Sequence, residues 1–176
     1  MEHVAIDLGG RESQICVRNS EGAILDEQRW PTAGLARYLA RRPKSRVVVE
    51  TCAEAFAIAD AALELGHEVR VVPAALVRSL GVGERGIKND RRDAQKLSEM
   101  SARMEVPSVH VPSQVARDRK TICGMREGLV EARTKLINTV RGWLRGQARQ
   151  LRSGSPETFG RRVRSHLKDV PPPHVD

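Results

Sequence analysis

The sequence of 176 residues is 40% hydrophobic and 30% charged, proportions that are typical of a globular protein rather than a disordered one. It contains no run near the roughly 18 consecutive apolar residues of a membrane span, and it does not open on a basic and then apolar secretion signal. Its three cysteines include no C-x-x-C pair, so they indicate neither a disulfide framework nor a structural zinc site. We therefore expect a cytoplasmic protein with one hydrophobic core and an appendage.

The net charge of +8 comes entirely from the last third of the chain. Residues 1–112 contain 16 Lys and Arg against 16 Asp and Glu, whereas residues 113–176 contain 14 against 6. A neutral body with a basic tail is typical of a protein whose tail follows the phosphate backbone of a nucleic acid. A solvated, charged helix face would give the same composition, so charge alone leaves both interpretations open.

The first elements along the chain form a predicted three-stranded meander. Its strands, the first continuously apolar and the other two more alternating, are His3–Leu8, Ser13–Arg18 and Ala23–Gln28. Next come predicted helices at Ala33–Arg41 and Ala53–Leu65, which alternate with predicted strands at Arg46–Glu50 and Glu68–Val72. The body then continues with a short helix at Ala74–Leu80, a glycine-bearing loop at Gly81–Gly86, a charged helix at Asn89–Arg103 and a strand-like segment at Ser108–Val111.

This order of elements predicts the fold class. A meander followed by alternating strands and helices gives a mixed sheet flanked by helices, which is the order expected of an RNase H-like α/β fold. A fold alone does not identify a function. The function therefore has to be argued from particular side chains.

A long basic helix is predicted from Ser113 to Leu151. Apolar residues recur along it every seven positions, at Val115, Ile122, Leu129, Leu136 and Trp143, and Met125, Ala132 and Val140 fall on the same side. Such a narrow stripe predicts a coiled-coil partner, although packing of the helix on its own domain remains an alternative. We divide the chain into an RNase H-like domain at 1–112, the coiled-coil-like helix at 113–152 and a Ser-, Gly- and Pro-rich linker or disordered tail at 153–176.

Two acidic residues lie in predicted buried strands, where a charge without a partner is unfavourable. Asp7 lies within the apolar run of residues 4–8, and Glu50 ends the β-branched run of residues 47–49. An unpaired charge at such a position would cost several kcal/mol. Both acids fall at the carboxyl ends of predicted central strands, where open α/β sheets place their ligands.

Two further acids open the charged helix. Asp90 and Asp93 stand three residues apart and so project from one helix face, although an N-cap and a first-turn residue would show the same pattern. Carboxylates that converge repel one another unless a cation lies between them, and hard oxygen ligands select Mg²⁺ or Mn²⁺ over zinc. A pair of such ions would support cleavage of a phosphodiester.

Four motifs give the chain a family resemblance. They are A-I-D-L-G at 5–9, V-V-V-E-T at 47–51, G-H-E-V-R-V-V-P-A at 66–74 and K-N-D-R-R-D-A at 88–94. With them, the chain from Val4 to about Leu151 resembles the DEDD-type transposases of the insertion-sequence one-ten family. The resemblance implies that Asp7, Glu50, Asp90 and Asp93 are the catalytic, metal-binding acids. Asn89 stands where the family usually has Thr.

The resemblance also implies an activity and partners. It implies an amino-terminal domain similar in fold to Holliday-junction resolvases, metal-dependent cleavage and strand transfer of DNA, a guide RNA, and homodimers or higher oligomers assembled through the long helix. Members of the family carry a second, carboxy-terminal domain with a nucleophilic serine, and nothing after Leu151 is long enough to be that domain. We expect the chain to bind metal and nucleic acid without completing recombination, with Ser153 and Ser155 as linker residues.

Basic residues in two places are predicted to contact nucleic-acid phosphates. Those beside the acids are Lys88, Arg91 and Arg92, and those along the long helix are Arg117, Arg119, Lys120, Arg126, Arg133, Lys135, Arg141 and Arg145. Solvated surface charge is the alternative. The chain has only two Trp, one Tyr and two Phe, so it offers no platform for stacking bases, and contacts to backbone and shape are expected instead.

Other functions fit parts of the same sequence. Asp7-Leu8-Gly9-Gly10 before a hairpin also resembles the first phosphate loop of sugar kinases and actin-like ATPases, but those proteins need a second domain and a further phosphate loop. A non-catalytic nucleic-acid-binding fragment would keep the fold and the basic helix. A junction resolvase acting alone would share the acids.

Overall fold

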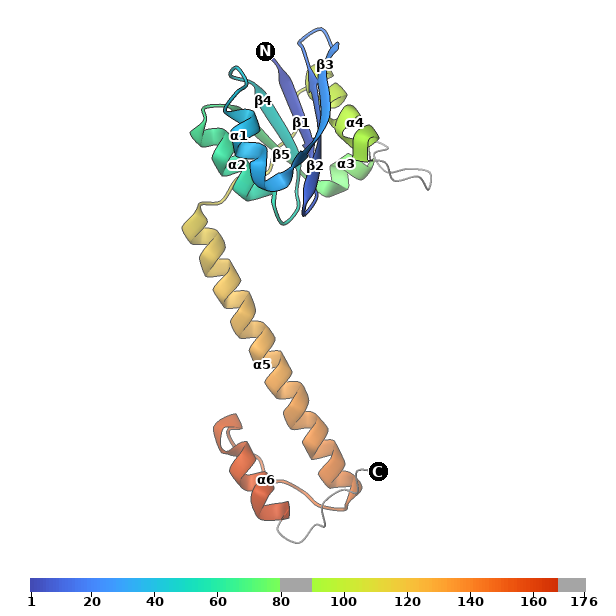
Figure 1. The fold of residues 1–176 in the computed structure, drawn as a ribbon. Coiled ribbons are helices and arrows are strands. Elements are labelled where there is room, and N and C mark those ends of the chain that lie inside the picture. Colours follow the sequence, from blue (N-terminus) through green and yellow to red (C-terminus); the bar gives the residue numbers. More distant parts are fainter. Residues whose placement is uncertain (80–89, 168–176) are drawn as a thin grey trace. The chain divides into compact units, whose positions relative to one another are not determined.

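The computed structural model describes the backbone of residues 1–79 and 90–167, and the side chains of residues 78, 79 and 90 lie outside the description. The predicted loop Gly81–Gly86 and the predicted phosphate contact Lys88 also lie outside the described residues. The chain divides into two compact units, an amino-terminal unit at Met1–Pro112 and a carboxy-terminal unit at Ser113–Asp176 (Figure 1).

The amino-terminal unit is built on one mixed sheet. Its strands are β1 (His3–Asp7), β2 (Glu12–Arg18), β3 (Ile24–Pro31), β4 (Arg46–Glu50) and β5 (Glu68–Val72), in the order β3-β2-β1-β4-β5. Strands β1, β2 and β3 pair antiparallel, whereas β4 pairs parallel to both β1 and β5. An antiparallel meander joined through its first strand to parallel strands is the RNase H-like arrangement, so the predicted fold class is confirmed.

Helices follow the strands in the predicted order. They are the 3₁₀ turn η1 (Thr32–Gly34), α1 (Leu35–Leu39), α2 (Ala55–Glu64), α3 (Ala74–Ser79) and α4 (Asp90–Arg103). The predicted strand at Ser108–Val111 is wrong. The backbone N–H of Val109 donates to the Val71 carbonyl at 2.8 Å, and the Ser108 hydroxyl accepts from the Val71 N–H at 2.9 Å. Pro107 and Pro112 flank the segment, and proline has no N–H to extend a ladder.

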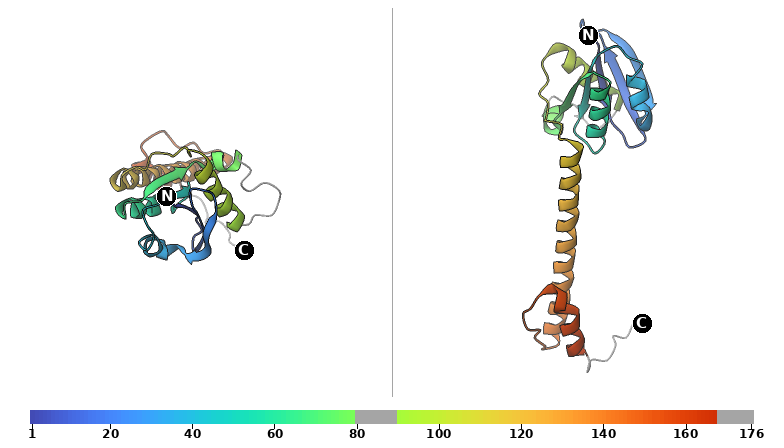
Figure 2. Two further views of the ribbon diagram at one scale, coloured as in Figure 1. Left: turned by 90° about the horizontal axis from the view of Figure 1, so that it is seen from above. Right: turned by 90° about the vertical axis from the view of Figure 1, so that its left-hand side faces the viewer.

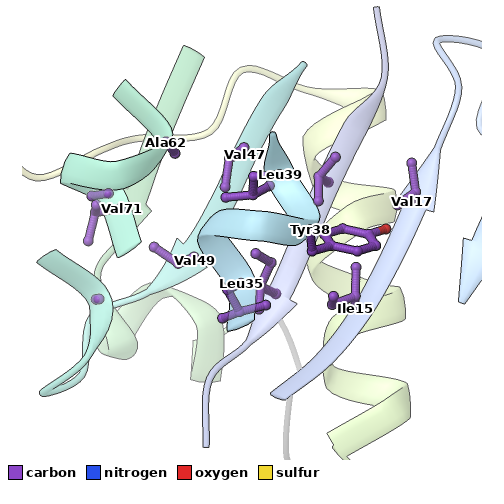
Figure 3. Close-up of a cluster of buried hydrophobic side chains, with 13 residues drawn as sticks. Ile15, Val17, Leu35, Tyr38, Leu39, Val47, Val49, Ala62 and Val71 are labelled. Carbon is purple, nitrogen blue, oxygen red and sulfur yellow. The ribbon is translucent and has the colours of Figure 1, made fainter. Parts of the chain in front are cut away.

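The sheet has a different core on each face, because successive strand residues point to opposite sides. One core cluster, drawn in Figure 3, contains Val4, Ile6, Val47 and Val49 together with buried residues of α1 and α2. The other cluster contains Ala5, Val48 and Val72 together with Val77 of α3 and Leu97 of α4. Helices α1 and α2 therefore cover one face, and α3 and α4 cover the other (Figure 1 and Figure 2).

The carboxy-terminal unit consists of the long helix α5 (Gln114–Gly146), the 3₁₀ turn η2 (Pro156–Thr158) and helix α6 (Phe159–Leu167). Ser113 caps α5, since its hydroxyl accepts from the Ala116 N–H at 3.3 Å. The helix ends before the predicted Leu151 because Ala148 adopts a left-handed conformation with φ 53°. None of the described helices is both long and apolar enough to cross a membrane.

Helix α6 corrects the prediction of a linker or disordered tail at 153–176. Prolines and glycines suggested a linker there, but Phe159, Val163 and Leu167 recur every four residues and give the helix an apolar side. The Arg141 guanidinium lies 6.0 Å from the centre of the Phe159 ring, and the Arg149 side chain donates to the His166 carbonyl. The tail therefore contains a helix that packs on the end of α5.

Candidate metal centre and nucleic-acid surface

Asp7 and Glu50 lie at the ends of neighbouring parallel strands. They directly follow Ile6 and Val49, which form the last residue pair between β1 and β4. Because side chains alternate along a strand, Asp7 shares a face with Ala5, and Glu50 shares that face with Val48. This is the face that α4 covers. Both acids are partly buried, so the structure brings these two predicted site residues to one edge of one face.

Two contacts fix the direction of α4 across that face. His3, at the start of β1, contacts the Ser101 hydroxyl through Nδ1 at 2.8 Å. The Ser98 hydroxyl donates to the sulfur of Cys16 at 3.2 Å, and Cys16 lies opposite Ala5 in the sheet. Residues nearer the start of α4 therefore lie over residues nearer the end of β1. Helix α4 runs antiparallel to β1, and its first turn points toward the end of β1 that carries Asp7.

The lengths of α4 and β1 indicate how far Asp93 and Asp7 lie from the His3–Ser101 contact. Eight residues of helix separate Asp93 from Ser101, a rise of about 12 Å at 1.5 Å per residue. Four residues of strand separate Asp7 from His3, a length of about 13 Å. Since His3 and Ser101 are in contact, these similar lengths lead us to expect Asp93 near the level of Asp7.

The rotation of α4 also directs Asp93 toward β4. The buried residues Ala94, Leu97, Ser98 and Ser101 define the side of α4 that faces the sheet. Asp93 lies on the flank of that side, one turn before Leu97, and it is partly buried. Leu97 packs in the same cluster as Val48 of β4 and Val72 of β5. Asp93 therefore lies on the flank of α4 nearer to β4, where Glu50 ends its strand.

The three described acids do not form a finished coordination shell. Within residues 1–79 and 90–167, no three described His, Cys, Asp or Glu side chains are close enough together to hold a metal ion. Asp90 begins α4, but its side chain lies outside the description. The donor set nevertheless fits a hard divalent cation, because all four groups are carboxylates and carboxylate oxygen is the ligand that Mg²⁺ and Mn²⁺ prefer.

One residue beside this centre escaped sequence analysis. Glu27 of β3 accepts from the Arg91 guanidinium, with Arg91 Nε at 2.8 Å, and it also accepts from the Gln95 side-chain amide. The Arg91 partner holds the pKa of the Glu27 carboxyl below its usual value. Arg91 is a predicted phosphate contact, and the structure places it on Glu27. Glu27 lies beside Asp26 near the end of the predicted strand Ala23–Gln28, so no sequence pattern set it apart.

Basic side chains of α5 lie on an exposed surface. Of the predicted phosphate contacts, Arg119, Lys120, Arg126, Lys135 and Arg145 are exposed, as is Arg92 of α4. Arg117 donates to the Gln114 side chain at 2.6 Å, and Arg133 lies 3.8 Å from Glu157. A cavity of about 380 Å³ near the end of α5 is lined by Asn138, Arg141, Arg145, Gln150, Leu151 and Ser153. The buried Arg141 Nε has no hydrogen-bond acceptor among the described groups.

The apolar stripe of α5 is exposed as well. The exposed fractions of Val115, Ile122, Leu129 and Leu136 lie between 58% and 72%, and Trp143 is 43% exposed. A groove of about 490 Å³ runs along this side and is lined by Ile122, Met125, Arg126, Leu129, Val130 and Arg133.

Comparison with known proteins assigns the chain to a family. The strand order defines the class as an RNase H-like α/β domain. The family model for DEDD transposases of the IS110 type, which is described as Transposase, matches residues 4–147. The chain therefore belongs to this DEDD transposase family, and the predicted resemblance is confirmed.

Curated relatives carry related names. The chain is 29% identical over 174 residues to the "Transposase for insertion sequence element IS1328" of Yersinia enterocolitica, with 97% of this chain and 48% of the relative covered. It is 27% identical over 144 residues to a "Probable family 20 transposase" of Pseudomonas aeruginosa, with 82% and 42% covered. It is 26% identical over 141 residues to the "Transposase for insertion sequence element IS1111A" of Coxiella burnetii, with 80% and 38% covered. The chain thus spans less than half the length of each.

Solved structures of RuvC from Thermus thermophilus also align with the chain. One, described as "in complex with Holliday junction substrate", has a TM-score of 0.41 and 16% identity, with 56% of this chain and 90% of that chain covered. The other has a TM-score of 0.39 and 18% identity, with 56% and 92% covered. The fold assignment rests on the strand order and not on these alignments.

Proposed function

We propose that the amino-terminal unit is the catalytic domain of a DNA transposase, and that Asp7, Glu50, Asp90 and Asp93 hold Mg²⁺ or Mn²⁺ for cleavage and strand transfer of DNA phosphodiesters. One observation carries the proposal: Asp7 and Glu50 end adjacent parallel strands on the face that α4 covers, and α4 begins with the segment that contains Asp90 and Asp93. The family membership supports the reaction class. It also favours a transposase over an actin-like ATPase, in which Asp90 and Asp93 would have no task.

The protein's contribution to this chemistry is to fix the acids in place. When bound, the metal would lower the pKa of a reacting water or hydroxyl and stabilise the leaving oxygen. Strands β1 and β4 pair with each other up to Ile6 and Val49, and Asp7 and Glu50 pair with β2 and β5, so their backbones have little freedom. Asp93 belongs to a separate helix. The relative position of α4 and the sheet therefore decides whether the acids bind one centre.

The carboxy-terminal unit is proposed to hold the nucleic acid. Its exposed arginines and lysines suit contacts to phosphates, and the cavity lined by Arg141 and Arg145 offers cationic groups to one anion. DNA is the proposed partner, together with a guide RNA that supplies sequence specificity, since the chain has few aromatic residues for reading bases. The exposed stripe of α5 is proposed to pair with a second copy as a coiled coil, because about 60% exposure of regularly spaced apolar residues is what a partner helix would cover.

Metal binding tests the proposed function directly. We expect Mn²⁺ to bind the chain in a calorimetric titration, and the Asp7→Asn, Asp93→Asn double variant to lose that binding while keeping its thermal unfolding temperature. Asp118→Asn is the matched control, since Asp118 is an exposed acid of α5 that pairs with Gln114. Equal Mn²⁺ binding by the double variant would overturn the carboxylate centre. No binding to the unaltered chain, even with DNA present, would indicate a non-catalytic nucleic-acid-binding protein.

A further inference from the structure

An acid of the edge strand of the sheet contacts helix α4. Glu27 lies in β3, and its side chain is only 13% exposed although β3 is the edge of the sheet. Its neighbour Asp26 accepts from the Tyr38 hydroxyl of α1 at 3.0 Å, on the opposite face. Alternation along β3 thus separates the two acids, and Glu27 is the one directed at α4.

Glu27 holds α4 at two points one turn apart. One carboxylate oxygen accepts from Nε and from a terminal nitrogen of Arg91, and the other accepts from the Gln95 amide. Arg91 and Gln95 stand at i and i+4 and so lie on one side of the helix. Because Arg91 occupies one carboxylate oxygen and Gln95 the other, the Glu27 side chain is held at both of its oxygens. We call this three-residue contact the Glu27 clamp.

The Glu27 clamp and Asp93 lie on opposite flanks of α4. Residues two apart on an α-helix are about 200° apart around its axis. Arg91 and Gln95 are each two positions from Asp93, one before it and one after it, and buried Ala94 faces the sheet between the two flanks. The clamp therefore grips the β3 side, and Asp93 projects on the side of β1 and β4.

Because of this arrangement, rotation of α4 about its own axis would move Asp93 and the residues of the clamp together. A side-chain oxygen at a radius of about 6 Å moves by about 1 Å when the helix rolls by about 10°. A preorganised site tolerates about 0.5 Å. The apolar contacts of Leu97 with the sheet resist separation more than they resist such a roll, because they are not directional. Hydrogen bonds of the clamp are directional and act on the first turns of α4, whereas those of Ser98 with Cys16 and of Ser101 with His3 act on its later turns.

We propose that Glu27 is a positioning residue that sets the rotation of α4, and through it the placement of Asp93 against Asp7 and Glu50. The role of Glu27 in holding α4 rests on the Glu27 contacts, and its effect on metal binding rests on the proposed function. It also gives Arg91 a task within the protein. Glu27 itself is not a metal ligand in this arrangement, since it lies on the opposite flank from Asp93.

The test compares three variants of the full 176-residue chain by Mn²⁺ calorimetry. Glu27→Gln keeps the shape of the side chain and removes its charge, and Arg91→Gln removes the other partner. We expect each to weaken Mn²⁺ affinity about tenfold, the scale of groups that orient metal ligands, and the double variant to weaken it no further than either single change. Glu12→Gln is the control, because Glu12 of β2 pairs with Arg29 of β3 at 3.6 Å and both side chains are well exposed. An unchanged affinity in Glu27→Gln would overturn the proposal.

A second measurement separates this inference from the proposed function. Amide hydrogen exchange of residues 94–98 without metal reports whether α4 is held, and we expect about fivefold faster exchange in Glu27→Gln than in Glu12→Gln. A charge exchange, Glu27→Arg with Arg91→Glu, should restore slow exchange. If the unaltered chain binds no Mn²⁺, the proposed function fails, and unchanged exchange in Glu27→Gln would then overturn the clamp independently.

Discussion

The two units of the chain place their charged residues in opposite ways. In the amino-terminal unit the acids Asp7 and Glu50 end strands that are buried on both sides, and all of the largest fully buried side chains in the described residues except Leu144 belong to this unit. In the carboxy-terminal unit the cations and the apolar stripe of α5 are both exposed. The first unit is organised by its own core, whereas α5 in the second leaves both its cations and its apolar stripe uncovered by the described residues.

The largest expected effect contrasts these two kinds of apolar residue. Ile6 is fully buried, so Ile6→Ala should lower the free energy of unfolding by about 3 kcal/mol through reduced burial and a cavity. Leu129 is 72% exposed, so Leu129→Ala should change the stability of the dilute chain by less than about 0.5 kcal/mol. Urea unfolding measures both changes.

The dependence of unfolding on protein concentration tests whether the exposed stripe of α5 has a partner. If α5 pairs with a second copy, the unfolding midpoint of the unaltered chain rises with concentration and that of Leu129→Ala rises less. Sedimentation shows whether the chain is a monomer. If Leu129→Ala lowers the free energy of unfolding of a monomer as much as Ile6→Ala does, the contrast between the two units is wrong.

A smaller effect is expected for nucleic-acid binding. Replacing Arg141 and Arg145 by Gln should weaken binding to duplex DNA and reduce the slope of log affinity against log salt by about 0.9 for each phosphate that the variant no longer neutralises. Fluorescence anisotropy at several salt concentrations measures the slope. Arg29→Gln is the matched control, since Arg29 is an exposed cation of β3 that pairs with Glu12. An unchanged slope in the double variant would exclude both arginines as phosphate-binding residues.

The smallest expected effect is a pH dependence of stability in the amino-terminal unit. Burial holds the pKa of His3 below its usual 6.5, with Arg46 lowering it further. The unfolded chain therefore binds a proton that the folded chain resists, so stability falls as the pH drops below about 6.5. Urea unfolding at pH 7, 6 and 5 should show a shallower fall for His3→Gln than for the unaltered chain. Parallel pH profiles would contradict this origin.

Sequence patterns predicted the elements that are decided locally. The strands Arg46–Glu50 and Glu68–Val72 have the predicted bounds because β-branched runs leave few alternatives. The strand predicted at Ser108–Val111 does not form, because the prolines beside it have no N–H for strand pairing. Pairing depends on a partner strand that is distant in the sequence, so the local pattern did not show this. Helix α6 was missed since three apolar residues are a weak signal beside linker-like prolines.

The residues of the candidate site could be proposed from the sequence, but the contacts that hold α4 beside them could not. Asp7 and Glu50 stand out because an apolar strand makes a charge conspicuous. Glu27 does not stand out, because its partners Arg91 and Gln95 are more than sixty residues away and only the register of the sheet brings them together. Interactions that depend on topology leave no local pattern in the chain.

The parallel pairing of β1 with β4 sets the order in which the candidate site is assembled during folding. Strands β1, β2 and β3 are joined by short turns, so their meander forms from contacts near in sequence. Strand β4 reaches β1 only after the whole meander and α1 have been synthesised, and closing that long loop is entropically unfavourable until the strands pair. On the ribosome, Asp7 therefore emerges well before Glu50. The nascent chain has no complete set of acids until α4 has followed.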